Sequence, residues 1–243
     1  KNLTVAFRAC FAAPEAKDVR LRLTGHALYR IYANGEFVGH GPARAGHGFY
    51  RVDEWSLTSQ LLPGTNVVVV EVAGYNANSY YLLDLPSFLQ AEIVANGKLI
   101  ASTAGDGVRF EAAVVSERLQ KVQRYSFQRP CSEVWRLTSD HARYRTHPDA
   151  PLQKVPCAVQ EAKALSPRRV PYPTFIQRPP VQRLSSGSVR KTELPKQLWK
   201  DRSLTAVGPA LAGFPEAELA TIPSLELQAV QTVSTLPDRQ SWS

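Results

Sequence analysis

Two asparagines and three tyrosines are concentrated in residues 74–81, GYNANSYY. An asparagine side chain offers both a hydrogen-bond donor and an acceptor, which suits the hydroxyl groups of a sugar. A tyrosine ring offers a flat apolar face for the C–H side of the same sugar. The pattern therefore predicts a loop that contacts carbohydrate through Tyr75, Asn76, Asn78, Tyr80 and Tyr81. The alternative is a polar turn between strands, with its tyrosines packed on a neighbouring domain.

Acidic residues that could work as a catalytic pair are scarce. Asp53 and Glu54 form the only adjacent acidic pair in residues 1–140. Glycoside hydrolysis needs two carboxyl groups that flank one bond, whereas successive residues of a strand point to opposite faces. We therefore expect a solvated strand end here, and no catalytic residue in the chain. Glu71 stands alone within the apolar run 67–72, so we expect a buried or edge-facing carboxylate paired with an arginine.

Histidines and glycines offer little further chemistry. His40 and His47 flank the loop GHGPARAGHG and could approach one metal ion, but no third ligand is evident. Glycines that permit positive φ explain the loop more simply, so we expect no metal site and no cofactor. The sequence also has no G-x-S-x-G nucleophile motif, and no helix pattern follows the glycines as a phosphate-binding loop requires.

The three cysteines are an odd number and have no metal-ligand spacing: Cys10, Cys131 and Cys157. Free buried thiols are the simplest expectation. One disulfide, between Cys10 and Cys131 for example, stays open because sequence alone does not establish pairing.

The net charge of +8 is unevenly distributed along the 243 residues. Residues 1–140 hold 15 Lys and Arg against 13 Asp and Glu, whereas residues 141–202 hold 13 against 4. A nucleic-acid-binding surface would alternate basic and stacking aromatic side chains, which this segment does not do, so no nucleic acid is expected. No run of about 18 apolar residues occurs, so no membrane span is expected either.

The first part of the chain has the pattern of an all-β domain. Residues 3–11, 19–24, 28–38, 49–57, 88–103, 108–115 and 132–137 alternate or are rich in β-branched and aromatic residues. Asn34-Gly35 and Asn96-Gly97 lie between such segments and predict hairpin turns, because both turn positions need positive φ. The continuous run 67–72 predicts a strand buried on both faces. Short strands with regular turns predict a jelly-roll or galactose-binding-like β-sandwich over residues 1–140.

Residues 141–243 differ in composition, with 13 of the 18 prolines lying after residue 140. Proline lacks the backbone donor that a helix interior or a central strand requires. The interspersed apolar residues, among them Tyr172, Phe175 and Trp199, are too many for a purely disordered linker. We expect an extended basic segment that packs against a neighbour and leads toward a further β domain. A short turn at 215–216 and a strand over 225–233 are expected within it.

Three sequence blocks resemble bacterial α-L-rhamnosidases of glycoside hydrolase family 78. They are YRIYANGEFVG with GPAR (29–39 and 41–44), KVQRYSFQRP (121–130) and SPRRVPYP (166–173). The resemblance implies an N-terminal β-sandwich that precedes further β domains and an (α/α)6 barrel, where two acidic residues hydrolyse terminal α-L-rhamnosides. In some relatives the corresponding sandwich binds rhamnose with calcium. Here the loop has no acidic residue and Asp84 is the nearest, so calcium stays open.

Three hypotheses follow. The chain is the non-catalytic N-terminal part of a rhamnosidase-like glycoside hydrolase whose partners are a rhamnose-containing glycan and downstream domains of the same polypeptide. Alternatively, it is a stand-alone carbohydrate-binding module, or a structural sandwich that docks on a partner and touches no sugar. The sequence leaves localisation open, and a periplasmic or secreted protein is favoured.

Overall fold

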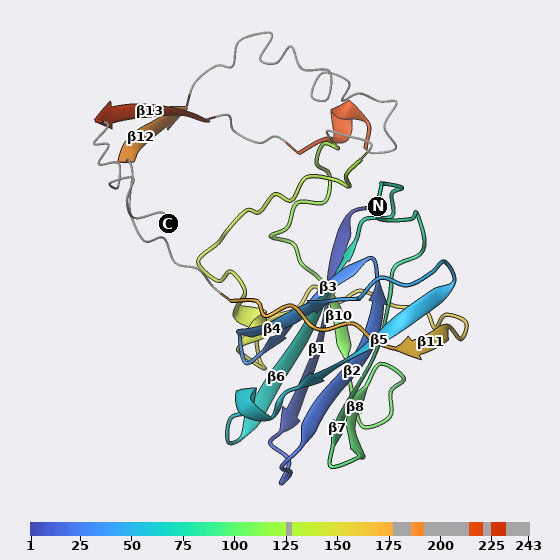
Figure 1. The fold of residues 1–243 in the computed structure, drawn as a ribbon. Helices are drawn as coiled ribbons and strands as arrows, with labels where there is room; N and C mark the ends of the chain where they lie inside the picture. Colours follow the sequence, from blue (N-terminus) through green and yellow to red (C-terminus); the bar gives the residue numbers. More distant parts are fainter. Residues whose placement is uncertain (125–127, 177–185, 192–213, 221–224, 232–243) are drawn as a thin grey trace, which may run out of the picture.

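The computed structural model describes residues 1–124, 128–176, 186–191, 214–220 and 225–231. Two sheets pack face to face in a β-sandwich (Figure 1). Within the described residues the helical segments are three single turns, η1 (Thr58–Gln60), η2 (Arg143–Arg145) and η3 (Glu216–Glu218). The all-β prediction is confirmed. None of these helical turns is long and apolar enough to cross a membrane.

The first sheet has the strand order β10-β1-β6-β3-β4. Its members are β10 (Glu111–Val114), β1 (Leu3–Ala12), β6 (Thr65–Gly74), β3 (Leu28–Ala33) and β4 (Glu36–Gly41). All four pairings are antiparallel, and β1 pairs with β6 over ten consecutive residues from Leu3↔Gly74 to Ala12↔Thr65. This long central pairing fixes where the loop that follows β6 leaves the sheet.

The second sheet has the order β11-β5-β2-β7-β8-β9. Its members are β11 (Ala164–Pro167), β5 (Phe49–Ser56), β2 (Val19–His26), β7 (Phe88–Ala95), β8 (Lys98–Ser102) and β9 (Val108–Arg109). The two edge strands β11 and β9 run parallel to their neighbours, and the other pairings are antiparallel. A separate antiparallel pair joins β12 (Ser186–Lys191) to β13 (Leu225–Gln231), so the strand expected over 225–233 is present at 225–231.

Both Asn-Gly pairs close hairpins, as predicted. Asn34 and Gly35 have φ of 51° and 87° between β3 and β4, and Asn96 and Gly97 have φ of 47° and 80° between β7 and β8. The turn residues therefore adopt the left-handed conformation that asparagine and glycine tolerate best.

The run Val67–Val72 is buried on both faces because the sandwich has a second apolar cluster outside its core. Val68, Val70 and Val72 face the core between the sheets. Val67 and Val69 face the other way and are covered by residues that follow β10, among them Val115, Tyr144 and Ala150. Residues on both sides of position 140 thus cover the outer face of β6.

One predicted strand is wrong. Residues 132–137 make only an isolated bridge, between Arg118 and Trp135, and the side chain of Leu137 is 67% exposed. Trp135 packs partly against the outer cluster through its ring. The aromatic side chain is therefore used in packing while the backbone finds no long strand edge to join.

The expectation of buried thiols holds only in part. All three cysteines are free, and Cys131 is buried, Cys10 half-buried and Cys157 exposed. Burial raises the pKa of the Cys10 and Cys131 thiols, which keeps them protonated at neutral pH.

Residues 144–176 make several contacts with the sandwich itself. The Arg145 Nε atom lies 2.6 Å from the buried Glu71 carboxylate, which confirms the expected pairing of Glu71 with an arginine. Further along, β11 joins the edge of the second sheet, and its Pro167 needs no donor there.

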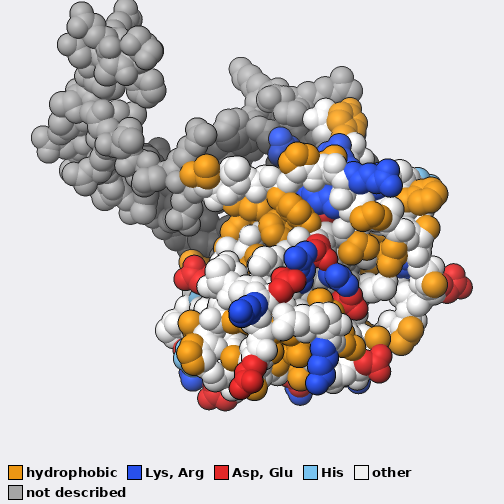
Figure 2. All heavy atoms as spheres, turned by 60° about the horizontal axis from the view of Figure 1, so that its bottom comes forward, with side chains coloured by type: hydrophobic (Ala, Val, Ile, Leu, Met, Phe, Trp, Pro, Cys, Tyr) orange, Lys and Arg blue, Asp and Glu red, His pale blue; other side chains and the backbone are white. Residues whose placement is uncertain are grey.

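Figure 2 shows Lys and Arg beside Asp and Glu near the middle of the face it presents, so charges of both signs mix on that face.

Candidate functional site

The loop that follows β6 contains all five residues expected to contact sugar, and the structure separates them. Tyr75 is 9% exposed and packs with Ala27 and Leu82 in a small apolar cluster. The Arg118 guanidinium lies 5.2 Å from its ring centre. Burial raises the pKa of the Tyr75 hydroxyl. The buried Tyr75 side chain therefore anchors the loop to the sandwich.

Asn76 and Asn78 use their amide groups to brace the same loop. The Asn76 Nδ2 donates to the carbonyl of Leu85 at 2.6 Å, and its Oδ1 accepts from the Ser87 hydroxyl at 3.4 Å. The Asn78 Oδ1 accepts from the backbone N–H of Asp84 at 2.8 Å. These bonds hold residues 76–87 in a compact turn, and sugar contact by the two amides stays a prediction.

Tyr80 and Tyr81 point outward and are 71% and 40% exposed. They line a groove of about 450 Å³ together with the glycine-rich loop that connects β4 to β5. We call this feature the tyrosine groove; its lining consists of residues 25–28, 42–51, 79–83 and Leu85. Phe49, which is 60% exposed, and Tyr50 add two more aromatic rings. The groove combines exposed aromatic faces with concavity, which is the general form of a sugar-contact surface.

The polar side chains of the groove are basic or neutral. Arg44, Arg51, His26 and His47 belong to the lining, and none of its residues is Asp or Glu. The Arg51 Nη1 donates to the Ser166 hydroxyl at 3.0 Å and to the Pro167 carbonyl at 3.3 Å. Burial lowers the pKa of His26, whose Nε2 lies 3.3 Å from the Leu83 carbonyl.

Asp53 differs from the solvated residue we expected. Its side chain is fully buried, where it accepts a hydrogen bond from the Tyr29 hydroxyl and one from the Arg168 Nη1 at 3.2 Å. Burial and the adjacent carboxylate raise the pKa of Tyr29. The prediction of a solvated Asp53 was wrong because its inward face meets the tyrosine of β3 and an arginine that arrives from the segment after β11.

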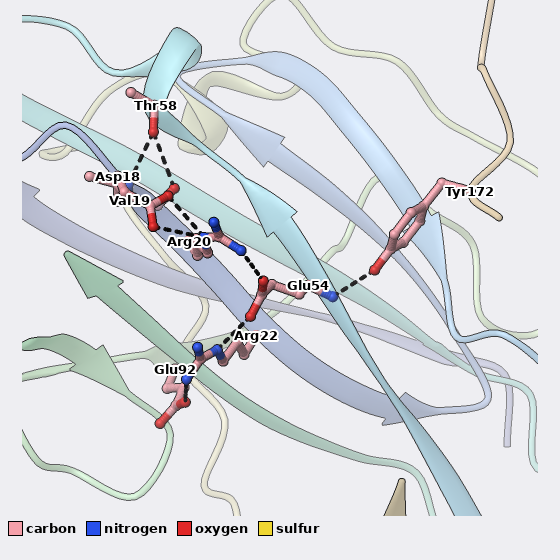
Figure 3. A network of polar contacts seen from close by, with 8 residues as sticks. All are labelled: Asp18, Val19, Arg20, Arg22, Glu54, Thr58, Glu92 and Tyr172. Atoms are coloured by element: carbon pink, nitrogen blue, oxygen red, sulfur yellow. Dashed lines mark hydrogen bonds and ion pairs between the residues drawn. The ribbon is translucent and has the colours of Figure 1, made fainter. Parts of the chain in front are cut away.

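Glu54 does lie on the outer face of the second sheet, as the alternation of strand residues requires (Figure 3). Its carboxylate accepts from the Arg22 Nε at 2.7 Å and also pairs with Arg20. Hydrogen bonds from Arg22 and Arg20 lower the pKa of Glu54. Asp53 and Glu54 therefore lie on opposite faces, each held by arginine, and cannot flank one glycosidic bond.

A second, smaller cavity of about 210 Å³ contains two further carboxylates, Glu71 and Glu133. The Glu71 Oε1 accepts from the Tyr144 hydroxyl and from Arg145, each at 2.6 Å. Glu133 accepts from both terminal nitrogens of Arg30, at 3.2 and 3.3 Å. His40 lines this cavity whereas His47 lines the tyrosine groove, so the two histidines do not share a site.

The loop offers few side-chain oxygens for calcium. Asp84 is the single carboxylate of residues 74–85, and the Asn78 oxygen is already bonded to the Asp84 backbone. Within the described ranges, no group of three or more His, Cys, Asp or Glu residues is placed to hold a metal ion.

Sequence reasoning did not select four residues of the groove lining: Arg44, Phe49, Tyr50 and Arg51. Arg44 lay within a loop interpreted through its glycines, and Phe49 and Tyr50 were interpreted as strand residues. All four residues lie in or just after the glycine-rich loop that connects β4 to β5, which the sequence does show. Only the fold reveals that this loop lies beside residues 79–83.

Neither a protein-family model nor a curated protein sequence matches the chain. Among solved structures, the chain is similar to a GH78 family rhamnosidase of Bacillus sp. GL1, with 25% identity and a TM-score of 0.58 over 71% of this chain and 19% of that one. A Streptomyces avermitilis α-L-rhamnosidase in complex with L-rhamnose matches at 18% identity and a TM-score of 0.43, over 79% of this chain and 18% of that one. The chain spans about a fifth of the length of these structures. The likeness to the Bacillus GH78 family rhamnosidase agrees with the expected GH78-like N-terminal region.

Proposed function

We propose that the chain is the non-catalytic N-terminal part of an α-L-rhamnosidase-like glycoside hydrolase, and that its sandwich contacts a rhamnose-containing glycan. The likeness to the Bacillus rhamnosidase supports the relationship, and the share of that chain covered leaves room for further domains. We also propose the division into a sandwich over residues 1–140 and a connecting segment over 141–243. Contacts such as Glu71 with Arg145 cross that division, so the connector helps to complete the sandwich.

The tyrosine groove is the observation that carries the glycan-contact proposal. Tyr80 and Tyr81 present their rings to solvent at its edge, while Tyr75, Asn76 and Asn78 hold the loop that displays them. Of the five residues expected to contact sugar, we therefore assign the contact to Tyr80 and Tyr81 and a positioning role to the other three.

The state of the carboxylates supports a non-catalytic role. An inverting glycosidase needs a protonated acid and an ionised base about 6.5–9.5 Å apart with room for water between them. Asp53, Glu54, Glu71 and Glu133 are each bonded to at least one arginine. Hydrogen bonds from Arg22 and Arg20 lower the pKa of Glu54, whereas a general acid requires a raised pKa.

Docking onto a partner domain is the second candidate, because the same exposed rings could pack against protein. Tyr80, Phe49 and Leu83 are 71%, 60% and 47% exposed along one groove. A docked groove would be filled by side chains and would not bind sugar. Sugar binding therefore separates the two proposals.

Calorimetric titration of the full chain with L-rhamnose tests the proposal. We expect saturable binding that weakens about tenfold in Tyr80→Ala, because an aromatic platform contributes about 1 kcal/mol beyond its buried area. Phe37→Ala removes a 44% exposed ring outside the groove and should leave the affinity unchanged. Absence of binding to the wild-type chain, or equal losses in both variants, would refute the proposed contact.

A further inference from the structure

The charged side chains that line the tyrosine groove are of one sign. They are the two arginines Arg44 and Arg51, and the lining has no carboxylate. We propose that the groove selects an acidic glycan, with the carboxylate of a uronic acid residue held by Arg44 and Arg51 while the aromatic rings contact the sugar. This inference rests on the proposed function, because it names the chemical class of the ligand for the same groove.

Arg51 is held in place without being neutralised. Its Nη1 donates to the Ser166 hydroxyl and the Pro167 carbonyl, and both acceptors are uncharged. Both come from β11, which pairs with β5 in register at Ser166↔Arg51. A positioned guanidinium that keeps its full charge is suited to a planar carboxylate, because it can donate two parallel hydrogen bonds.

Arg44 belongs to the same lining, in the glycine-rich loop, and is exposed. No ion pair joins Arg44 or Arg51 to a carboxylate in the described part of the chain. Lys163 adds positive charge behind the groove, since its Nζ lies 4.8 Å from the ring centre of Phe88 and 5.8 Å from that of Tyr50. The local field therefore favours an anion.

Elsewhere on the sandwich, three arginines of strands β2 and β3 are paired with acids. Arg20 and Arg22 share Glu54, and Arg30 pairs with Glu133. The groove contrasts with this: its lining includes aromatic rings and two arginines that are paired with no acid among the described residues. A neutral sugar would use only the rings, whereas a uronic acid would use both.

Titration of the full wild-type chain with glucuronate, glucose and acetate tests the inference. Glucose and glucuronate share a ring and differ by the carboxylate, so we expect glucuronate to bind about tenfold more tightly at low salt. Sodium chloride at about 1 M should remove most of this preference, because screening acts on the exposed guanidinium groups. Equal affinity for the two sugars overturns the inference, as does acetate binding as tightly as glucuronate.

Variants separate this inference from the proposed function. Arg44→Gln should abolish most of the preference for glucuronate over glucose, and Arg109→Gln, an exposed arginine outside the groove lining, should leave it intact. Tyr80→Ala should weaken both sugars by the same factor. A chain that binds L-rhamnose without preferring glucuronate overturns only the inference. A chain that binds none of these sugars overturns the inference together with the proposed function.

Discussion

Asp53 shows how one residue links distant parts of this chain. Its carboxylate is fully buried, and its partners are Tyr29, 24 residues earlier, and Arg168, 115 residues later. A buried charge is tolerated only when it is paired and hydrogen-bonded. The arginine that follows β11 therefore satisfies an electrostatic requirement of the sandwich interior.

Removal of that arginine should be costly. Arg168→Ala leaves the buried carboxylate with only the Tyr29 hydroxyl, and we expect the free energy of unfolding to fall by about 3 kcal/mol. The adjacent Arg169 is exposed, so Arg169→Ala should change it by less than about 0.5 kcal/mol. Urea denaturation of the two variants and the wild type measures both values. Equal stability of the two variants would show that the Asp53–Arg168 pair is not needed.

At the level of elements, the two Asn-Gly hairpins share a turn conformation but differ in what their asparagines hold. The Asn34 Nδ2 donates to the Gln60 carbonyl and to the Asn66 Oδ1, each at 2.8 Å, and its Oδ1 accepts from the Val67 N–H at 2.9 Å. The Asn96 Oδ1 accepts a single bond from the Asp18 N–H, at 3.3 Å. The first turn is thereby tied to the start of β6, the central strand of its sheet.

Alanine at the two positions should therefore have unequal effects. Both substitutions incur the cost of positive φ, about 1 kcal/mol, and Asn34→Ala also loses three partly buried hydrogen bonds worth about 1 kcal/mol each. We expect Asn34→Ala to lower the free energy of unfolding by at least about 2 kcal/mol more than Asn96→Ala. Chemical denaturation decides this, and similar losses would mean that the bonds of Asn34 to β6 contribute little.

The sequence was most informative where structure is local. The turn chemistry of Asn34-Gly35 depends on two adjacent residues, and the burial of Val67–Val72 follows from an unbroken apolar run. Strand alternation also correctly placed Asp53 and Glu54 on opposite faces. Which of those faces is buried depends on the order of strands in the sheets, and no local pattern contains that information.

The candidate site was also predictable only in part, because only some of its features follow from local sequence. Exposed tyrosines in the loop after β6 were expected, and Tyr80 and Tyr81 are exposed. Both ends of the Asn76 amide bond to Leu85 and Ser87, and the Asn78 Oδ1 accepts from the Asp84 N–H, which composition could not reveal. The opposite wall, from Arg44 to Arg51, is contributed by a loop about 30 residues earlier and is adjacent only in the folded chain.

At the scale of the whole molecule, the described residues that follow position 140, as far as Phe175, pack on the sandwich. Arg145 pairs with Glu71 on the first sheet, and Arg168 pairs with Asp53 beneath the second. Tyr172 and Phe175 then lie against Trp55, with ring centres 4.3 and 6.0 Å away. Part of the positive charge of residues 141–202 therefore neutralises buried acids of the sandwich.

The same segment also shapes the tyrosine groove, since β11 supplies the Ser166 and Pro167 oxygens that hold Arg51. The sandwich, strand β11 and the glycine-rich loop must all be in place before the groove has its form. The proposed contact with glycan is therefore a property of the assembled fold rather than of the loop 74–81 alone.

A crystal structure of the full chain with a rhamnose-terminated oligosaccharide tests this account most directly. We expect a sugar ring in the groove between residues 42–51 and 79–83, in contact with the ring of Tyr80 or Tyr81. A sugar bound in the smaller cavity beside Glu133, or a groove occupied by protein side chains in the presence of saturating ligand, would contradict it.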